Sequence, residues 1–352
     1  MTFQEKRAEV LARLQKAAEL EMATIPPYFT ALLSIHRNSN RAAAENIRSV
    51  MLEEMLHLAL VSNVISSLGG KVKLTGDHVP RYPLKLNYEG KGFADRHFDV
   101  HLAPFTAETV KTFMAIEQPR MLEKPLRTFE LRQITLPENT IGEFYDSIVS
   151  LLEDLDELAA TDGRALFVGN PSIQITEDYY WSAGGKPVVV IDLASAKAAL
   201  EIVIEQGEGT PDALSDGDHA KFGHPYEVAH YFRFREIDAG RRFSETDMPS
   251  DEPSGSLLPV DYGAVYRILI DPTAEDYVGT PLEALNTAFN LQYSRMLLQL
   301  EEALNGNPKV LYNAIMNGMH GLSELAHEMM KIQIEGDKQG RCGCPSFEWV
   351  AV

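Results

Sequence analysis

The segment RSVMLEEMLHLALVSNVISSLGG, residues 48–70, has the pattern of a long buried helix that two glycines end. Its apolar residues recur every three or four positions, which is the spacing of one helix face. Glu54 and His57 stand in the middle of that face, among Ile47, Val50, Val61, Val64 and Leu68. An unpaired buried carboxylate costs several kcal/mol or takes up a proton, so the pattern predicts a compensating group in the interior.

A first helix precedes this one and carries a similar substitution. The spacing predicts helices over Glu5–Ser34 and Arg41–Leu68, and the short link between them predicts an antiparallel hairpin. Glu21 lies on the apolar face of the first helix. Pro26 and Pro27 free backbone carbonyls one turn back, either as a packing kink or as a bend that opens room beside Glu21.

A second hairpin repeats the same groups further along the chain. Helices are expected over Ala194–Gln206 and from Pro225, a residue suited to a first helical turn. Glu205 lies on the former, although it also borders other acidic residues. Glu227 and His230 lie on the latter, on one face with Phe234 and Ile237.

The repeat predicts a metal centre. A Glu and a His three positions apart on a helix can reach one ion, and a four-helix bundle with two lone Glu and two Glu-x-x-His pairs can hold two. The predicted ligands are Glu21, Glu54, His57, Glu205, Glu227 and His230, with Glu54 and Glu227 as bridging, catalytic carboxylates. These donors suit two iron ions, and manganese also fits. The alternative is a set of buried ion pairs without metal.

A third Glu-x-x-His pair, Glu324 and His327, falls off the apolar stripe of the last helix. We expect it on a solvated face without a metal.

The remaining chain predicts a cap and an extra hairpin. Residues 71–190 are rich in Pro and Gly, with β-like runs HFDVHLAP, NPSIQIT and KPVVVIDL around helices near Thr106–Glu117 and Ile141–Leu158. We interpret them as a mixed α/β insertion. The expected domains are a bundle over 1–240 and, over 241–352, a linker, a short strand (VYRILID) and helices near Pro281–Asn305 and Pro308–Ile334.

Composition excludes some partners. The 352 residues carry a net charge of −19, which argues against binding to nucleic acid or anionic membrane. No apolar run approaches a membrane span, and the N-terminal residues lack the apolar segment of a signal peptide. The only cysteines, Cys342 and Cys344, do not suggest a disulfide scaffold, so a cytoplasmic protein is expected, with these residues in an exposed tail.

Several strings resemble a known family. LEMATIPPYFTALLSI, the 48–70 segment, HVPRYP, IVIEQGEG and EVAHYFRFREI are similar to the ferritin-like domain of iminophenylpyruvate dimer synthases of violacein and rebeccamycin type. The resemblance covers about residues 10–240. It implies a mainly α, ferritin-like fold and dimetal-carboxylate chemistry at the six residues named above. Those enzymes are much longer, and this chain matches their ferritin-like portion alone.

These observations favour an oxidoreductase that uses dioxygen on a small organic substrate, such as an amino-acid-derived imine or an aromatic amine. The insertion would form one wall of the substrate pocket. Tyr28, Tyr226 and Tyr231 are candidate hydrogen-bond donors near the metals, and Arg81 is a candidate partner for a substrate carboxylate. The alternative is a non-catalytic iron-binding protein. The sequence does not decide whether the protein forms a homo-oligomer.

Overall fold

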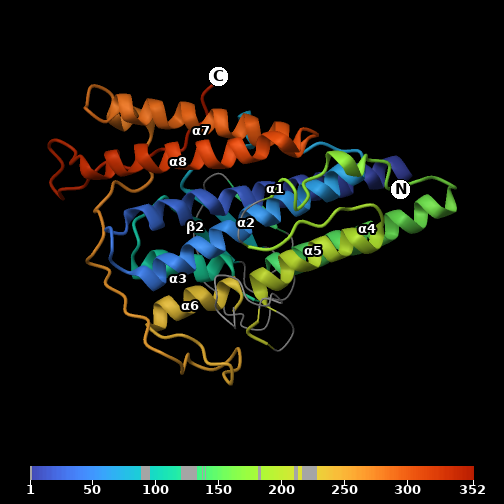
Figure 1. Ribbon diagram of the computed structural model, residues 1–352, viewed down its shortest axis with the longest axis horizontal. Coiled ribbons are helices and arrows are strands. Elements are labelled where there is room, and N and C mark those ends of the chain that lie inside the picture. Colours follow the sequence, from blue (N-terminus) through green and yellow to red (C-terminus); the bar gives the residue numbers. More distant parts are fainter. Residues whose placement is uncertain are drawn as a thin grey trace.

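The fold is mainly helical, as expected. The computed structural model describes residues 2–88, 96–119, 133–136, 138, 140–180, 184–209, 213–215 and 228–352. Its helices lie in three tiers (Figure 1): the C-terminal pair α7 and α8, the N-terminal pair α1 and α2, and then α3 to α6.

The middle tier is the N-terminal hairpin. Helices α1 (Phe3–Ser34) and α2 (Arg41–Ser67) pack against each other along much of their length. A capping box between Thr2 and Glu5 begins α1. Helix α1 continues through its two prolines. Because Pro27 has no N–H, the Ala23 carbonyl lacks its helical hydrogen bond and accepts one from the Tyr82 hydroxyl at 2.7 Å instead.

Four helices form the tier on the other side of this hairpin. They are α3 (Ala107–Ile116), α4 (Ile141–Thr161), α5 (Leu193–Glu208) and α6 (His230–Ala239). Helix α3 packs on α6, and α4 packs on α5. Helix α1 contacts α4, whereas α2 contacts α5 and α6, so this tier encloses one long face of the hairpin.

The insertion is mixed, but its strands differ from those expected. Strand β1 (Leu84–Tyr88) pairs antiparallel with β2 (Arg96–Val100) and parallel with β3 (Gln133–Leu136), in the order β2-β1-β3. Of the three expected β-like runs, only HFDVHLAP contributes a strand to this sheet, β2. The NPSIQIT run contains a 3₁₀ turn (Pro171–Ile173), and the KPVVVIDL run is irregular before α5 begins.

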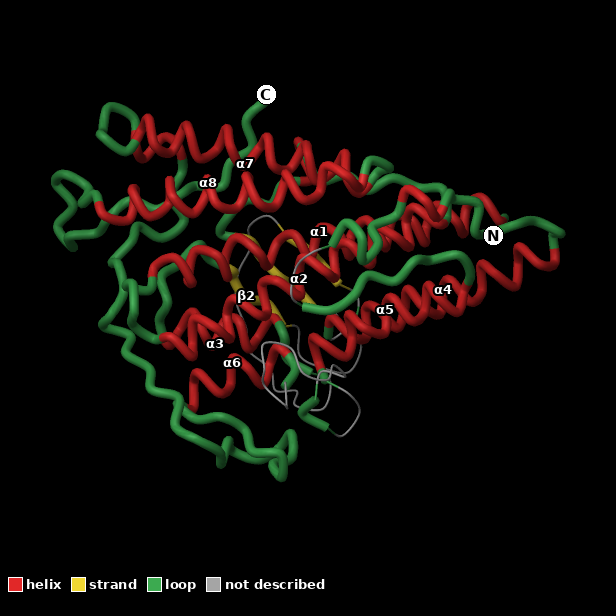
Figure 2. The backbone as a smooth tube through the Cα atoms, in the orientation of Figure 1, coloured by secondary structure: helices red, strands yellow, loops and turns green. Residues whose placement is uncertain are grey.

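The connection to the last hairpin runs along one edge of the molecule as irregular chain (Figure 2). The expected strand VYRILID forms only isolated bridges, Val265 with Ile35 and Ile268 with Cys342. Helices α7 (Glu283–Leu304) and α8 (Leu311–Lys331) follow and pack against each other.

The C-terminal tail is not an exposed appendage. Cys344 is fully buried, and its backbone N–H donates to the Tyr277 hydroxyl at 2.9 Å, so the expectation of an exposed cysteine pair is wrong at this residue. Ser346 exchanges hydrogen bonds with Asn286 of α7, which fixes the tail on the hairpin.

Helix α2 has the length and composition of a membrane span, although the sequence suggested no such segment. Of its most apolar 18-residue stretch, 89% is buried inside the protein. Within the described residues α2 is therefore the central core helix.

Candidate metal centre

Five ionisable side chains meet in the interior between the α1–α2 hairpin and the tier of α3 to α6. Glu21 comes from α1, Glu54 and His57 from α2, Glu117 from the end of α3, and His230 from the start of α6. None is more than 5% exposed. Burial of three carboxylates in one place requires compensation by protons or cations.

The first three-donor group joins the N-terminal hairpin. Glu21, Glu54 and His57 each offer one ligand atom, and these atoms lie within 4.8 Å of one another. The His57 Nδ1 atom is 3.2 Å from Glu21 Oε2 and 3.9 Å from Glu54 Oε1. One cation between them would contact two carboxylates and one imidazole.

The second group adds residues from α3 and α6. Glu54, Glu117 and His230 also offer ligand atoms within 4.8 Å of one another. The His230 Nδ1 atom is 3.0 Å from Glu54 Oε1 and 3.6 Å from Glu117 Oε2. The same Glu54 oxygen therefore lies between the two imidazoles, whose stacked rings are 5.3 Å apart.

Glu54 is the electrostatic centre of the cluster. Burial, with repulsion from Glu117 and Glu21, raises the pKa of Glu54 to about 8. Its second oxygen, Oε2, accepts a hydrogen bond from the Thr24 hydroxyl at 2.9 Å. Without a cation, this carboxylate thus tends to hold a proton at neutral pH.

A hydrogen-bond chain orients His57. The Gln206 amide donates from Nε2 to the Gly184 carbonyl at 2.9 Å, which turns Gln206 Oε1 toward His57 Nε2, also at 2.9 Å. Because an amide oxygen only accepts, His57 Nε2 carries the hydrogen. In the neutral ring, the lone pair on Nδ1 then faces Glu21 and Glu54.

Replacement of Gln206 tests this orientation. We expect Gln206→Leu to weaken metal binding at the Glu21–Glu54–His57 group by about 10- to 100-fold, the usual cost of losing a group that orients a ligand. Titration of the metal-free protein with manganous ion would measure the affinity. Glu205→Gln, at the neighbouring position, is the matched control, and an equal loss there would contradict the assignment.

A buried ion pair orients His230. The His230 Nε2 atom is 2.9 Å from Glu53 Oε2, and Arg233 Nη1 is 2.9 Å from Glu53 Oε1. Although burial opposes the charge, Arg233 lowers the pKa of Glu53 to about 2, so this carboxylate accepts hydrogen bonds only. His230 Nε2 is therefore the donor, and His230 Nδ1 faces the Glu54 and Glu117 carboxylates.

Loss of Arg233 is expected to destabilise the protein. Arg233→Met leaves the Glu53 charge uncompensated, which costs about 3–5 kcal/mol of unfolding free energy at pH 7. The folded-state pKa of Glu53 lies below its ordinary 4.5, so the pair stabilises above that pH and its contribution falls as the pH approaches 2. The deficit, measured by urea unfolding, should therefore shrink in acid.

Two further variants sharpen this test. Glu53→Gln in the Arg233→Met background removes the orphaned charge and should recover most of the loss. Arg235→Met breaks the neighbouring pair with Glu252, whose side chain is 84% exposed, and should cost about 1 kcal/mol or less. Equal costs for Arg233→Met and Arg235→Met would contradict the role given to the buried pair.

Two buried tyrosines hold the outer carboxylates. The Tyr145 hydroxyl of α4 donates to Glu21 Oε1, and the Tyr28 hydroxyl of α1 donates to Glu117 Oε1. Burial and the Glu21 charge raise the pKa of Tyr145 well above its usual value, so it stays a donor. Each outer carboxylate keeps its other oxygen toward a histidine, His57 or His230.

The structure brings four of the six predicted ligands together. Glu21, Glu54, His57 and His230 converge, and Glu227 lies outside the described residues. Glu205 is half-buried on α5 and belongs to neither of the three-donor groups found among the described residues. The residue of α5 that reaches the cluster is its neighbour, Gln206.

The expected helix does not include the residues just before His230. Helix α6 begins at His230, and Ala229 has the extended backbone of a residue before the first turn. Val228 instead forms an isolated bridge with Ser215, and its carbonyl accepts from Arg233 Nε at 2.6 Å. His230 is thus the first helical residue. The predicted start at Pro225 lies outside the described residues, as does Tyr226.

Glu117 was missed because it has no His three residues later and lies in the segment interpreted as a cap. The signal that could have found it is burial phase. Val110, Phe113 and Glu117 recur at steps of three and four and are all buried. An acidic residue thus ends the apolar stripe of α3, as Glu21 and Glu54 interrupt those of α1 and α2.

Other candidates lie away from the cluster. Glu324 is exposed and His327 half-buried with Nδ1 against the Ser323 carbonyl, in agreement with a solvated face. Arg81 is exposed, and Tyr231 packs edge-on against Phe232.

The cluster is compatible with metal binding. Carboxylates and imidazoles are the donors that iron and manganese accept. His230 Nδ1, next to two carboxylates, has the environment of a ligand atom. The Glu53 contact on its other nitrogen is the outer partner that ligating histidines usually have.

Two known proteins are similar to most of this chain. The dichlorochromopyrrolate synthase of Lentzea aerocolonigenes is 25% identical over 341 residues, which cover 86% of this chain and 29% of that protein. The 2-imino-3-(indol-3-yl)propanoate dimerase of Chromobacterium violaceum is 24% identical over 369 residues, which cover 91% of this chain and 33% of that protein. The chain therefore spans about a third of the length of these relatives.

A solved structure shares the whole architecture. The crystal structure of a ferritin-like protein from Caulobacter vibrioides superposes with a TM-score of 0.59 at 22% identity, over 97% of each chain. This likeness bears on the fold alone. The ferritin-like family profile matches residues 14–239, which include all five clustered side chains. With most of its length matched in this way, the chain belongs to the ferritin-like family.

Proposed function

We propose that this protein binds two iron ions in the Glu21–Glu54–His57 and Glu54–Glu117–His230 groups and is an oxidoreductase that uses dioxygen on a small organic substrate. The observation that carries the proposal is that the two buried groups share the Glu54 carboxylate. A shared carboxylate holds two cations close together, which is the arrangement of a dinuclear centre.

The residues divide the work between the two positions. Glu21 and His57 would hold one ion, Glu117 and His230 would hold the other, and Glu54 would serve both. Cations and protons compete for the same lone pairs, so metal binding releases protons from this cluster. The raised pKa of Glu54, about 8, supports this competition at neutral pH.

Two reduced iron ions held in this way would supply electrons to dioxygen. The protein's own contribution is to exclude water and to position hydrogen bonds. The donors and their partners are almost fully buried, and the Tyr28 and Tyr145 hydroxyls keep Glu117 and Glu21 in fixed orientations. Such preorganisation would hold these carboxylates in place for iron without reorganisation of the protein.

The substrate class is suggested by the relatives. One is named for dimerising an indole-bearing imino acid, and the other for synthesising dichlorochromopyrrolate. We propose an amino-acid-derived imine as the substrate, with an aromatic amine as the second choice. The coupling of two such molecules is a further proposal, because the chain spans only about a third of those enzymes.

A second candidate is a non-catalytic metal site. It is favoured by the closure of the cluster, since none of its five side chains is more than 5% exposed. In this function the metals would serve only to neutralise the carboxylates and hold α1, α2, α3 and α6 together.

One experiment separates the two functions. Protein loaded anaerobically with ferrous ion is exposed to dioxygen with indole-3-pyruvate and ammonia, which give the imino acid in solution. If the protein is an enzyme, we expect two irons per chain in the wild type, together with dioxygen uptake and formation of an oxidised product. Both the uptake and the product formation should be lost in Glu54→Ala. Two bound irons with no substrate-dependent uptake would favour the non-catalytic site. Absence of stoichiometric iron would contradict both.

A further inference from the structure

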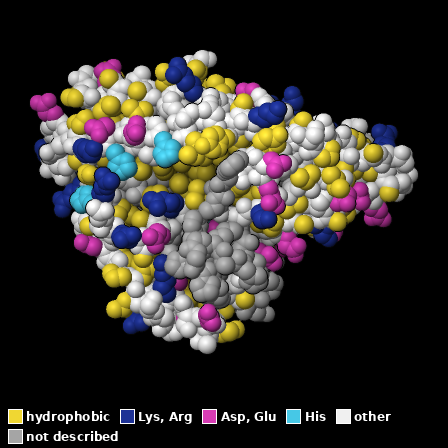
Figure 3. All heavy atoms as spheres, in the orientation of Figure 1, with side chains coloured by type: hydrophobic (Ala, Val, Ile, Leu, Met, Phe, Trp, Pro, Cys, Tyr) yellow, Lys and Arg dark blue, Asp and Glu magenta, His cyan; other side chains and the backbone are white. Residues whose placement is uncertain are grey.

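A second feature of the interior is an apolar cavity on the other side of the N-terminal hairpin. It lies between α1 and α2 on one wall and α7 and α8 on the other, and it encloses about 60 Å³. That is several times the space a single water molecule needs. Hydrophobic side chains also gather at the seam between α8 and the tier below it (Figure 3).

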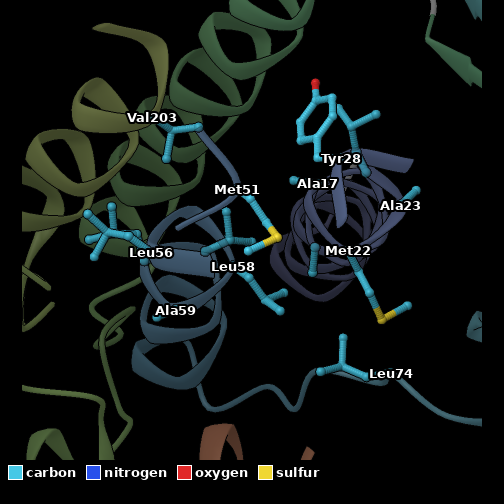
Figure 4. Close-up of a cluster of buried hydrophobic side chains, with 14 of the residues drawn as sticks. Ala17, Met22, Ala23, Tyr28, Met51, Leu56, Leu58, Ala59, Leu74 and Val203 are labelled. Atoms are coloured by element: carbon cyan, nitrogen blue, oxygen red, sulfur yellow. The ribbon is translucent and has the colours of Figure 1, made fainter. Parts of the chain in front are cut away.

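The cavity is separate from the carboxylate cluster. Met22 and Met55 line it, and they follow Glu21 and Glu54 directly in the chain. A step of one residue turns a helix by about 100°, so these neighbours leave α1 and α2 in different directions. In Figure 4 Tyr28, which contacts Glu117, and Met22 lie on opposite sides of α1.

The walls exclude charge. Most lining residues are Leu, Ile, Met and Phe, and no charged side chain among the described residues lines the cavity. A charged ligand would therefore lose its hydration without gaining a counter-ion. Four methionines, which adapt easily to a guest because their side chains are flexible, are Met22, Met55, Met296 and Met319.

One residue of the wall carries a buried hydroxyl without a hydrogen-bond partner among the described residues. Tyr293 is 3% exposed, and its hydroxyl makes no hydrogen bond within the described part of the chain. The other tyrosine of the wall, Tyr180, already donates to the Leu52 carbonyl at 3.2 Å. Because a buried hydroxyl without a partner is unfavourable, Tyr293 is suited to bind a ligand oxygen.

The cavity is long and narrow. Its α7 wall runs from Tyr293 to Leu304, and its α8 wall from Leu311 to Leu322, so it follows the hairpin for about 16 Å at the helical rise of 1.5 Å per residue. Tyr293 stands at one end, where its ring packs edge-on against Phe347. A small volume spread over this length suits a chain better than a ring system.

We propose that this cavity binds a slender, neutral aliphatic molecule whose terminal oxygen accepts a hydrogen bond from Tyr293. Alcohols, esters and amides of unbranched chains belong to this class. The proposal goes beyond the metal centre and does not depend on it, because its wall contains none of the five clustered side chains.

Calorimetric titration with hexan-1-ol tests the proposal, with hexanoate and indole as charged and aromatic comparisons. Hexan-1-ol should bind the wild type and bind more tightly than either comparison. Tyr293→Phe keeps the ring and should weaken binding about fivefold, the effect of one neutral hydrogen bond. Ala59→Leu and, independently, Ile315→Phe fill the cavity and should abolish binding.

The matched control is Leu298→Ala, at a position on α7 that is 40% exposed and outside the cavity wall, which should leave binding unchanged. Circular dichroism reports whether each variant keeps its fold. Absence of hexan-1-ol binding, tighter binding of hexanoate or indole, or full affinity in both folded cavity-filling variants would overturn the proposal. Unchanged affinity in Tyr293→Phe would overturn the contact with Tyr293.

Discussion

Replacement of Glu54 with alanine is expected to empty both metal positions. Glu54 is the single carboxylate common to the two three-donor groups, and its Oε1 atom lies 3.0 Å from His230 Nδ1 and 3.9 Å from His57 Nδ1. Loss of an outer orienting partner alone weakens metal binding by 10- to 100-fold, so the loss of a bridging ligand should weaken both sites by more than about a hundredfold.

Elemental analysis of purified, iron-loaded protein measures this effect directly. We expect two irons per chain in the wild type and close to none in Glu54→Ala, with the helical circular dichroism signal retained. Glu324→Ala is the control, because Glu324 belongs to the exposed Glu-x-x-His pair of α8. Retention of one firmly bound iron in Glu54→Ala would mean that Glu54 is not shared.

Replacement of Glu117 with glutamine is expected to remove one ion and spare the other. Glu117 belongs only to the group with His230, and its substitution leaves Glu21, Glu54 and His57 in place. Glutamine keeps the size of the side chain and a possible contact with Tyr28, so the change is chiefly one of charge. Iron content should fall from two per chain to one.

The control for Glu117 is the residue that the helix pattern favoured. Glu205→Gln should keep two irons, because Glu205 is half-buried on α5 and belongs to neither group. The reverse result, with metal lost in Glu205→Gln and kept in Glu117→Gln, would mean that Glu205 of α5 is the third carboxylate ligand. It would contradict the site described above.

The sequence predicted those parts of the site that lie on long, regular helices. Periodicity identified α1 and α2 almost to their ends, and the polar residues on their buried stripes, Glu21, Glu54 and His57, all reach the cluster. This prediction succeeds because burial phase on a helix fixes which residues face the same side.

The other half of the site could not be predicted in this way. Glu117 caps a helix of ten residues inside the insertion, and His230 is the first residue of α6, so neither belongs to a long stripe. Their meeting depends on how α3 and α6 pack on each other and on α2, which is a tertiary property. The roles of Gln206 and Glu53 depend likewise on contacts between residues 149 and 177 positions apart.

The most direct test of the account is the position of metal ions in crystals grown with manganous salt. The anomalous signal should show two ions about 3.5–4 Å apart. The Glu54 carboxylate should lie between them, with His57 Nδ1 on one ion and His230 Nδ1 on the other. A single ion, or ions bound elsewhere while Glu54 contacts only protein groups, would contradict the shared centre.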